Sequence, residues 1–271
     1  MTEKEESETR SLRSREGARA WKATVAAVKA AGLATGRAAK RAYLAVDPDV
    51  RQHVADLPLA ATTMIGRRRK PIEALPDDGH RPILCVHGWG GHPQNFWPLK
   101  GVLWLHGRRR VYSIAYEAEP TLEDGAAELS RALHAIVTAN DLGADAEIDI
   151  VAHSMGGLVV RLAMLDDAFA ARVRTIVTLA TPHQGTHAAR FLATHRALDL
   201  RPGSPVLARL ASQVPWSGPR LVAFWSPADV LMLPATTATL EGADNRELAG
   251  ISHNAFLTRP RVLTNVERAL T

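Results

Sequence analysis

The sequence predicts an α/β protein with a mostly parallel central sheet, helices on both faces of that sheet and an N-terminal helical extension. From Arg81 onward, short apolar runs rich in β-branched residues alternate with stretches of helical periodicity. Strands that alternate with helices need crossover connections, which make the strands parallel and cover both faces of the sheet. The composition agrees, because 46% of the 271 residues are hydrophobic and 23% are charged. Such a composition excludes collagen-like and wholly disordered chains.

The predicted strands and helices of the α/β part follow one another along the chain. We expect strands at 82–87, 110–116, 147–152, 173–180 and 221–225, and a short strand near 246–248. We expect helices at 95–106, 122–139, 155–165 and 255–270. We assign these elements to a single domain, residues 76–271.

Residues 1–75 form a basic N-terminal extension, for which we expect two helices. The first 72 residues contain 15 Lys and Arg against 8 Asp and Glu, whereas the rest of the chain contains 18 against 20. One helical pattern runs from Trp21 to Val46. Asp47 and Pro48 then resemble the N-cap and first-turn proline of a second helix near 49–65.

The extension raises the question of partners and location. Only 6 of the 33 basic residues are Lys, so we ascribe part of the basic charge to Arg- and Ala-rich composition. We expect no nucleic-acid partner. The charged start is unlike a secretory signal, and no apolar run is long enough to span a membrane, so we expect a cytoplasmic protein. The weakly amphipathic stretch 19–46 has three interpretations, namely packing on the main domain, peripheral contact with a membrane surface, and self-association. The sequence leaves the oligomeric state open.

The cysteine and histidine pattern gives little support for a metal site. Cys85 is the single cysteine, so neither an internal disulfide nor a zinc ribbon can form. His183 and His187 have i, i+4 spacing and His195 follows, but no carboxylate motif accompanies them. We expect neither a metal nor another cofactor.

A serine lies at the end of the third predicted strand, in the string Ala152-His153-Ser154-Met155-Gly156, and a helical pattern follows it directly. A strand, a sharp turn and a helix around G-x-S-x-G, here with Ala for the first Gly, form the nucleophile elbow. This turn needs small residues beside the serine and exposes its hydroxyl above the sheet. A simple serine N-cap is the alternative, but the strand-turn-helix context favours Ser154 as a nucleophile.

A serine nucleophile needs a base, and the base needs a carboxylate that orients it. With a nucleophile elbow, the acid and then the histidine follow the serine on loops after later strands. Asp229 follows the strand 221–225, and His253 precedes the last predicted helix. Singly, Asp229 could be a turn residue and His253 a neighbour of a helix cap. Found together in the required order, they predict a Ser154–Asp229–His253 triad.

A glycine-rich string, His87-Gly88-Trp89-Gly90-Gly91, follows the first predicted strand. Backbone N–H groups in such a loop, together with the N–H of Met155, could hold the oxyanion of a tetrahedral intermediate. A glycine-rich turn without that role is the alternative. The position at the carboxyl end of a strand favours the oxyanion hole.

Residues 82–271 resemble the bacterial lipases and esterases of the α/β-hydrolase superfamily. The likeness is greatest to the small group with an Ala-His-Ser-Met-Gly elbow, which residues 152–156 match. Three further features match as well: the glycine-rich loop, the Ser-x-Ala-Asp segment at 226–229 and the late histidine. The resemblance implies an α/β-hydrolase fold, with Ser154 as nucleophile, Asp229 as acid and His253 as base. It further implies Trp89 and Met155 as backbone oxyanion donors.

The substrate is less well defined by the sequence. Apolar side chains near the expected mouth of the site, Trp97, Val230 and Leu231 among them, suggest an acyl pocket, but core packing would explain them too. The insert 182–217 is either a lid or cap over that pocket or a rigid structural segment. We expect a lipase or carboxylesterase that acts on an ester or lipid. The alternatives are a polyester depolymerase, a phospholipid deacylase, and a catalytically silent binding protein held at a membrane.

Overall fold

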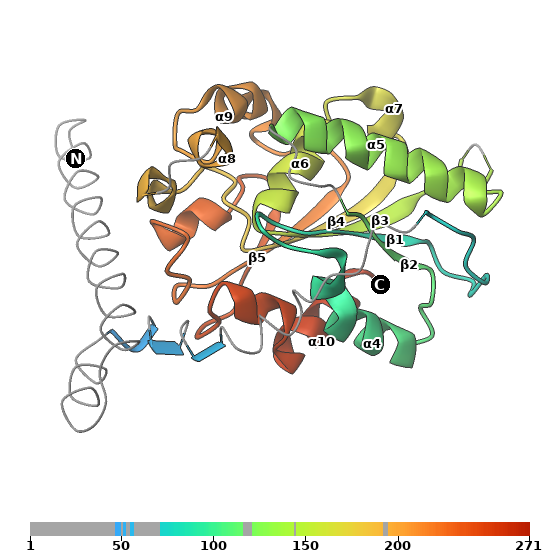
Figure 1. The fold of residues 1–271 in the computed structure, drawn as a ribbon, viewed down its shortest axis with the longest axis horizontal. Coiled ribbons are helices and arrows are strands. Elements are labelled where there is room, and N and C mark those ends of the chain that lie inside the picture. Colours follow the sequence, from blue (N-terminus) through green and yellow to red (C-terminus); the bar gives the residue numbers. More distant parts are fainter. Residues whose placement is uncertain are drawn as a thin grey trace.

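The computed structural model describes residues 71–115, 121–143, 145–191 and 195–271, together with 47–49, 51–52 and 55–56 of the N-terminal extension. A single sheet runs through the middle of the molecule (Figure 1). Its six strands are all parallel and lie in the order β2-β1-β3-β4-β5-β6. They are β1 Ile83–Val86, β2 Val111–Ser113, β3 Ile148–His153, β4 Val173–Leu179, β5 Arg220–Trp225 and β6 Asp244–Glu247. The predicted α/β class with a parallel sheet is therefore confirmed.

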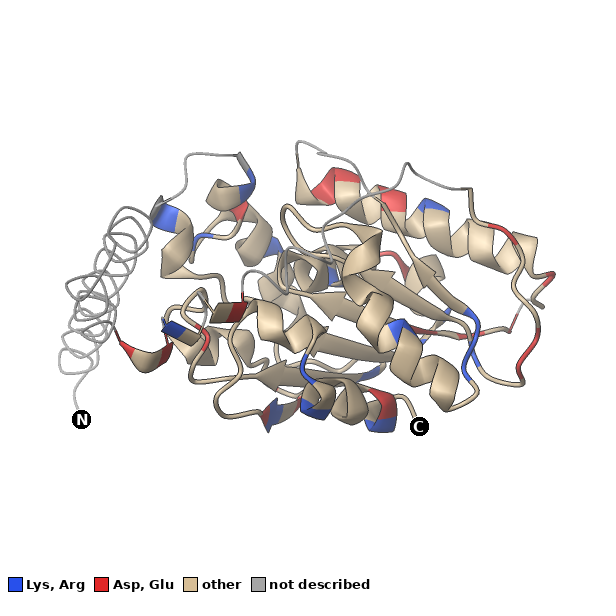
Figure 2. Ribbon diagram, turned by 60° about the horizontal axis from the view of Figure 1, so that its bottom comes forward, with Lys and Arg blue, Asp and Glu red and all other residues tan. Residues whose placement is uncertain are grey.

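Helices cover both faces of the sheet, as the buried strands require. On one face lie α5 Leu122–Ala139 and α6 Met155–Ala163, and on the other lie α4 Trp97–Leu105 and α10 Pro260–Ala269 (Figure 1). Two hydrophobic clusters fill the spaces between the sheet and these layers. Most Lys, Arg, Asp and Glu residues lie on the outer helices and the connecting loops (Figure 2). A short helix, α7 Asp167–Ala170, and several 3-10 turns complete the connections.

The order of the strands reverses beside the elbow. The chain leaves β1 toward β2 on one side, then returns to form β3 on the other side of β1. In register, Val86 at the end of β1 pairs with Ala152 near the end of β3. In open α/β sheets, ligands bind at the carboxyl ends of the strands where the order reverses. The glycine-rich loop after β1 and the elbow after β3 lie at that point.

The closing helix differs from its prediction. In place of one helix over 255–270, the structure has a 3-10 helix η5, Asn254–Leu257, and then α10 from Pro260. Arg259 has extended backbone angles, φ −73° and ψ 124°. A residue before proline avoids the helical region, and proline suits the first helical position, so the helix must begin at Pro260.

The insert between β4 and β5 is mainly helical. It contains η2 His187–Phe191, α8 His195–Asp199, α9 Pro205–Leu210 and η3 Ala211–Gln213. Its buried apolar side chains join the hydrophobic cluster on the α6 face, with Leu210 among them. Arg161 of α6, 1% exposed, donates to the carbonyl oxygens of His183 and Leu210 and to the side chain of Gln213. One buried guanidinium therefore connects the insert to the core.

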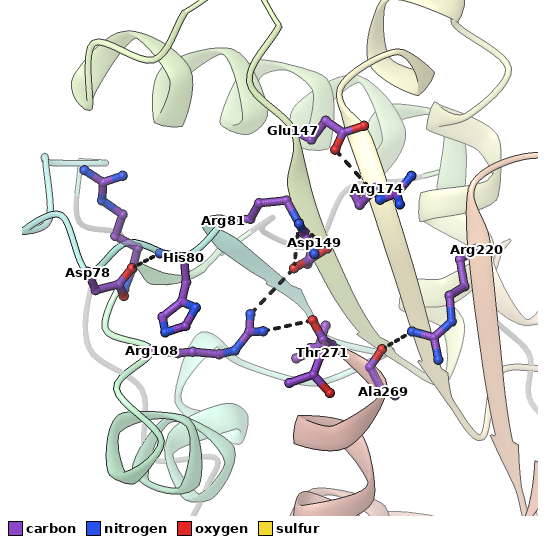
Figure 3. A network of polar contacts seen from close by, with 12 residues as sticks. Asp78, His80, Arg81, Arg108, Glu147, Asp149, Arg174, Arg220, Ala269 and Thr271 are labelled. Carbon is purple, nitrogen blue, oxygen red and sulfur yellow. Dashed lines mark hydrogen bonds and ion pairs between the residues drawn. The ribbon is translucent and has the colours of Figure 1, made fainter.

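Ion pairs and hydrogen bonds at the amino ends of the strands link the sheet to the end of α10 (Figure 3). Asp149 at the start of β3 is fully buried and pairs with Arg81 at 3.2 Å and with Arg108 at 3.7 Å. Burial raises the pKa of Asp149, and the two guanidinium groups oppose that shift. Arg108 also donates to the carbonyl oxygen of Leu270, and Arg220 to that of Ala269. These contacts hold α10 against the amino ends of the strands.

The described residues of the extension agree with a helix that begins near Pro48. The Asp47 carboxylate accepts a hydrogen bond from the Asp49 N–H at 2.8 Å, as an N-cap does. Residues 48–49, 51–52 and 55–56 are helical. The predicted helix at 21–46 and the proposed membrane contact at 19–46 lie outside the described residues. Within the described part of the chain, no helix is both long enough and apolar enough to cross a membrane.

Candidate active site

Ser154 occupies a strained turn between β3 and α6. Its backbone has φ 54° and ψ −130°, a region that side-chain-bearing residues rarely adopt. The Ser154 N–H donates to the Leu179 carbonyl, and the Ser154 carbonyl accepts from Gly157 N–H and the Thr181 hydroxyl. A strained backbone conformation persists only where several contacts from neighbouring residues fix it. These contacts supply that constraint.

Glycines make the turn possible, because three backbone segments meet there. A Cβ on Gly156 would lie 2.5 Å from the His87 carbonyl oxygen, and one on Gly88 would lie 2.8 Å from Ser154 Cβ. A Cβ on Gly157 would overlap the side chain of Thr181. Distances this short are closer than atoms can pack, so these positions need glycine. The glycine-rich loop after β1 therefore lies directly against the elbow.

The three residues of the predicted triad lie within hydrogen-bond distance of one another. His253 Nε2 lies 2.9 Å from Ser154 Oγ, and His253 Nδ1 lies 2.8 Å from Asp229 Oδ2. Because a carboxylate only accepts, Nδ1 carries the proton, which leaves Nε2 free to accept from the serine hydroxyl. The side chains of Asp229 and His253 are both buried. This is the arrangement of a nucleophile, a general base and a group that orients the base.

The loops that carry the acid and the base are joined by Ser226, a residue that sequence reasoning did not single out. Its buried hydroxyl oxygen accepts from the Ala228 N–H and from the Ile251 N–H, both at 3.2 Å. Asp229 is further fixed because its Oδ1 accepts from the Leu231 N–H at 3.0 Å. The Ser-x-Ala-Asp string contains this serine, but its contact with the histidine loop has no local sequence signal.

Two further histidines lie beside the triad and remain neutral at physiological pH. Burial lowers the pKa of His153 to about 3 and that of His87 to about 4. His153 Nε2 lies 3.1 Å from the carbonyl oxygen of His253. A carbonyl oxygen only accepts, so the single ring proton of His153 lies on Nε2, which donates to the backbone of the loop that carries His253.

The residues predicted for the oxyanion hole flank the serine. Met155 is the first residue of α6, where a helix leaves its N–H groups without intrahelical partners. Trp89 follows Gly88, which contacts Ser154. The two N–H groups therefore come from the two segments that meet at the nucleophile.

The predicted acyl-pocket residues come from two separate segments of the chain, the loop after β5 and the start of α4. Val230 and Leu231 directly follow Asp229 and are partly buried. Trp97, 53% exposed at the start of α4, lines a cavity of about 330 Å³ beside the edge strand β2, and none of the triad residues lines that cavity. The pocket stays a prediction.

Two of the histidines that suggested zinc, His183 and His187, have described side chains. His183 is buried and its Nε2 lies 3.1 Å from the Thr178 hydroxyl. No group of three or more His, Cys, Asp or Glu side chains among the described residues is arranged to hold a metal ion.

Comparison with known proteins agrees with this architecture. The family described as the PGAP1-like alpha/beta domain matches residues 115–195, which include β3, the elbow and β4. The mature Bacillus licheniformis lipase BlEst2 superposes with a TM-score of 0.61 at 16% identity, over 74% of this chain and 96% of the lipase. Aspergillus fumigatus lipase B gives 0.59 at 14% identity, over 85% of this chain and 70% of that one.

A third solved structure, the phospholipase PlaB from Legionella pneumophila, gives a TM-score of 0.59 at 14% identity, over 71% of this chain and 60% of the phospholipase. The parallel sheet, the matched family and these structures agree. The chain therefore has the α/β-hydrolase fold, and the proteins of this fold that it resembles include two lipases and a phospholipase.

Proposed function

We propose that the protein is a serine hydrolase that cleaves carboxylic esters of acyl or lipid-like substrates through an acyl-enzyme intermediate. The observation that carries the proposal is the continuous hydrogen-bonded line from Ser154 through His253 to Asp229, at 2.9 and 2.8 Å. A serine in a strained elbow, next to a histidine whose other nitrogen faces a buried carboxylate, has the geometry of an activated nucleophile.

In the acylation step, His253 Nε2 takes the proton of the Ser154 hydroxyl while Ser154 Oγ bonds to the ester carbonyl carbon. The carbonyl oxygen becomes an oxyanion, and the N–H groups of Trp89 and Met155 stabilise it. Protonated His253 then gives its proton to the alcohol oxygen as the ester C–O bond breaks. Asp229 stabilises the positive imidazolium and keeps its proton on Nδ1.

In the deacylation step, His253 removes a proton from a water molecule as that water attacks the acyl carbon. Collapse of the second tetrahedral intermediate releases the carboxylic acid and returns the proton to Ser154 Oγ. Every proton transfer in this cycle uses His253, and the chemistry requires no metal or organic cofactor. We propose that Val230 and Leu231, next to the acid, contact the acyl chain, and that Trp97 extends this apolar surface.

The proposal is tested by hydrolysis of p-nitrophenyl esters from acetyl to palmitoyl, for the wild type, Ser154→Ala and Ser212→Ala. Ser212 is an exposed serine on η3 and serves as the matched control. We expect Ser154→Ala to lower kcat by at least about 10³-fold with an unchanged unfolding midpoint, and Ser212→Ala to leave kcat unchanged. Ester hydrolysis that survives Ser154→Ala would contradict the proposal.

The same assay separates the substrate classes. Activity that peaks at long chains means a lipase, and a peak at short chains means a carboxylesterase. Parallel reactions with a phospholipid and with an aliphatic polyester test the two alternative hydrolases. Failure of the wild type on every substrate, together with no labelling of Ser154 by a fluorophosphonate, would favour a binding protein without catalytic activity.

A further inference from the structure

A carboxylate of the N-terminal extension contacts the loop that carries His253. Asp56 Oδ2 accepts a hydrogen bond from the Ser252 hydroxyl at 2.5 Å, and Asp56 Oδ1 accepts from the Arg259 guanidinium at 2.8 Å. Gln52, one helical turn earlier, donates to Asp56 Oδ1 at 3.0 Å. Asp56 is only 7% exposed. A residue 196 positions before Ser252 is therefore buried against the catalytic loop.

The two partners of Asp56 bracket the catalytic histidine. Ser252 immediately precedes His253, and Arg259 immediately precedes α10. Between them lies the 3-10 helix η5, and backbone hydrogen bonds from Ala255 to Ser252 and from Arg259 to Ala255 link the segment internally. One carboxylate thus ties both ends of the segment 252–259.

Other contacts that support His253 and its loop come from the α/β domain. Asp229 holds its Nδ1, the ring of His153 lies against its carbonyl oxygen, and Ser226 holds the N–H of Ile251. The side chain of Ser252 is fully buried, and its hydrogen bond to Asp56 reaches a charged acceptor. Hydrogen bonds to an ionised acceptor are shorter and stronger than neutral ones, so Asp56 should hold the Ser252 side chain firmly.

We propose that Asp56 is a positioning residue for the hydrolase reaction: through Ser252 and Arg259 it fixes the segment that aims His253 at Ser154. The inference rests on the proposed function, because it assumes that His253 is the general base. It gives a catalytic task to the N-terminal extension. A displacement of about 1 Å at a reacting group can cost about 10²-fold in rate, so a loosened histidine loop should lower kcat.

The main test compares Asp56→Asn with Asp49→Asn in the full-length protein. Asparagine keeps the size of the side chain but removes the charge and replaces one acceptor oxygen by an NH2 donor. It therefore loses the ion pair with Arg259 and cannot accept from the Ser252 hydroxyl at that oxygen's position. Asp49 is an exposed carboxylate of the same segment and is the matched control. We expect Asp56→Asn to lower kcat about 10- to 100-fold with KM changed less than about threefold, and Asp49→Asn to change neither. Equal kcat in both variants overturns the inference.

A second variant guards against a simple loss of folding. Ser252→Ala removes the other side of the contact, and the double variant with Asp56→Asn should fall no further in kcat than Asp56→Asn alone, since both changes break one linkage. Full additivity of the two effects contradicts positioning. The kcat of each variant is measured at a temperature where it is fully folded. A lower unfolding temperature together with a wild-type kcat would mean that Asp56 only stabilises the fold, which also contradicts the positioning role.

A readout that needs no turnover separates this inference from the proposed function. The proton between His253 Nδ1 and Asp229 gives a low-field NMR resonance, which reports the orientation of the imidazole. We expect Asp56→Asn to shift or broaden that resonance and Asp49→Asn to leave it in place. Should the wild type hydrolyse no ester, the proposed function fails while the resonance still decides whether Asp56 positions His253. An unmoved resonance in Asp56→Asn overturns the positioning role.

Discussion

At the scale of single residues, the site depends on how closely backbone segments approach the nucleophile. Ser154 sits at positive φ, and the glycines around it allow the His87–Gly91 loop to lie against the turn. The strained conformation costs on the order of 1–3 kcal/mol and must be stabilised by its surroundings. Substitutions that push these segments apart should therefore affect the site before they affect the rest of the fold.

Gly156→Ala tests this packing. The added methyl group would lie 2.5 Å from the His87 carbonyl oxygen and 2.6 Å from that of Val86, so the first turn of α6 must move away from β1. We expect a loss of about 1–3 kcal/mol in the free energy of unfolding and a loss of most esterase activity. Urea unfolding and ester hydrolysis measure the two effects.

The matched control is Gly101→Ala in α4. An added Cβ there has no atom within 4 Å, and the residue is exposed on a helix. Alanine in place of an exposed helical glycine stabilises by about 0.5–1 kcal/mol. Opposite signs in the two variants support the packing argument, and similar small effects in both would refute it.

At the scale of elements, α6 does more than begin at the nucleophile. Its Arg161 holds the insert through the carbonyl groups of His183 and Leu210 and the side chain of Gln213. Burial lowers the pKa of Arg161 to about 10, so the guanidinium is still charged at neutral pH. From these contacts we predict that the insert is rigid and not a mobile lid.

Arg161→Met should release the insert from α6. The variant keeps an unbranched apolar stem but leaves two buried carbonyl groups without their donor, which we expect to cost about 3 kcal/mol. Hydrogen exchange should accelerate in α9 and η3 relative to α5. The control is Arg209→Met, at an exposed position on α9, which should leave exchange in those helices unchanged. If α9 in Arg161→Met is as well protected as in the wild type, Arg161 does not anchor the insert.

The same elements show what local sequence can and cannot predict. The strands, the elbow and the order of Asp229 and His253 have local signals, since apolar runs, small residues and loop positions are visible along the chain. Arg161 has none, because an arginine in a helical pattern normally lies on the solvated face. The split of the last helix was missed although Pro260 marks it, because the apolar periodicity continues across the proline.

At the scale of the whole molecule, contacts between residues far apart in the sequence could not be predicted from the sequence. Asp56 and Ser252 are 196 positions apart, and nothing near either residue indicates the other. The pocket could not be predicted for the same reason. Whether Trp97 lies in the core, in a pocket or on the surface depends on which face of α4 packs against the rest of the protein. Composition and periodicity establish a parallel sheet with its site at the carboxyl ends, whereas these tertiary contacts decide the shape of that site.

The pH dependence of global stability follows from the buried histidines. His153 has a folded-state pKa of about 3 against an ordinary value of 6.5, because burial disfavours its charged form. Between those two values the unfolded chain binds a proton that the folded protein does not. The free energy of unfolding therefore falls as the pH is lowered through this window and is fully retained above pH 6.5.

His153→Gln should flatten this profile, because glutamine keeps an N–H near the His253 carbonyl but does not titrate. For one such histidine, the wild type should lose about 2 kcal/mol more than the variant between about pH 7.5 and pH 5. Urea unfolding at a series of pH values measures the difference. His134→Gln, at an exposed position on α5, is the control and should follow the wild-type profile. Parallel profiles for the wild type and His153→Gln would mean that burial does not hold His153 neutral. The conclusion that its single ring proton lies on Nε2, toward the loop that carries His253, would then be wrong as well.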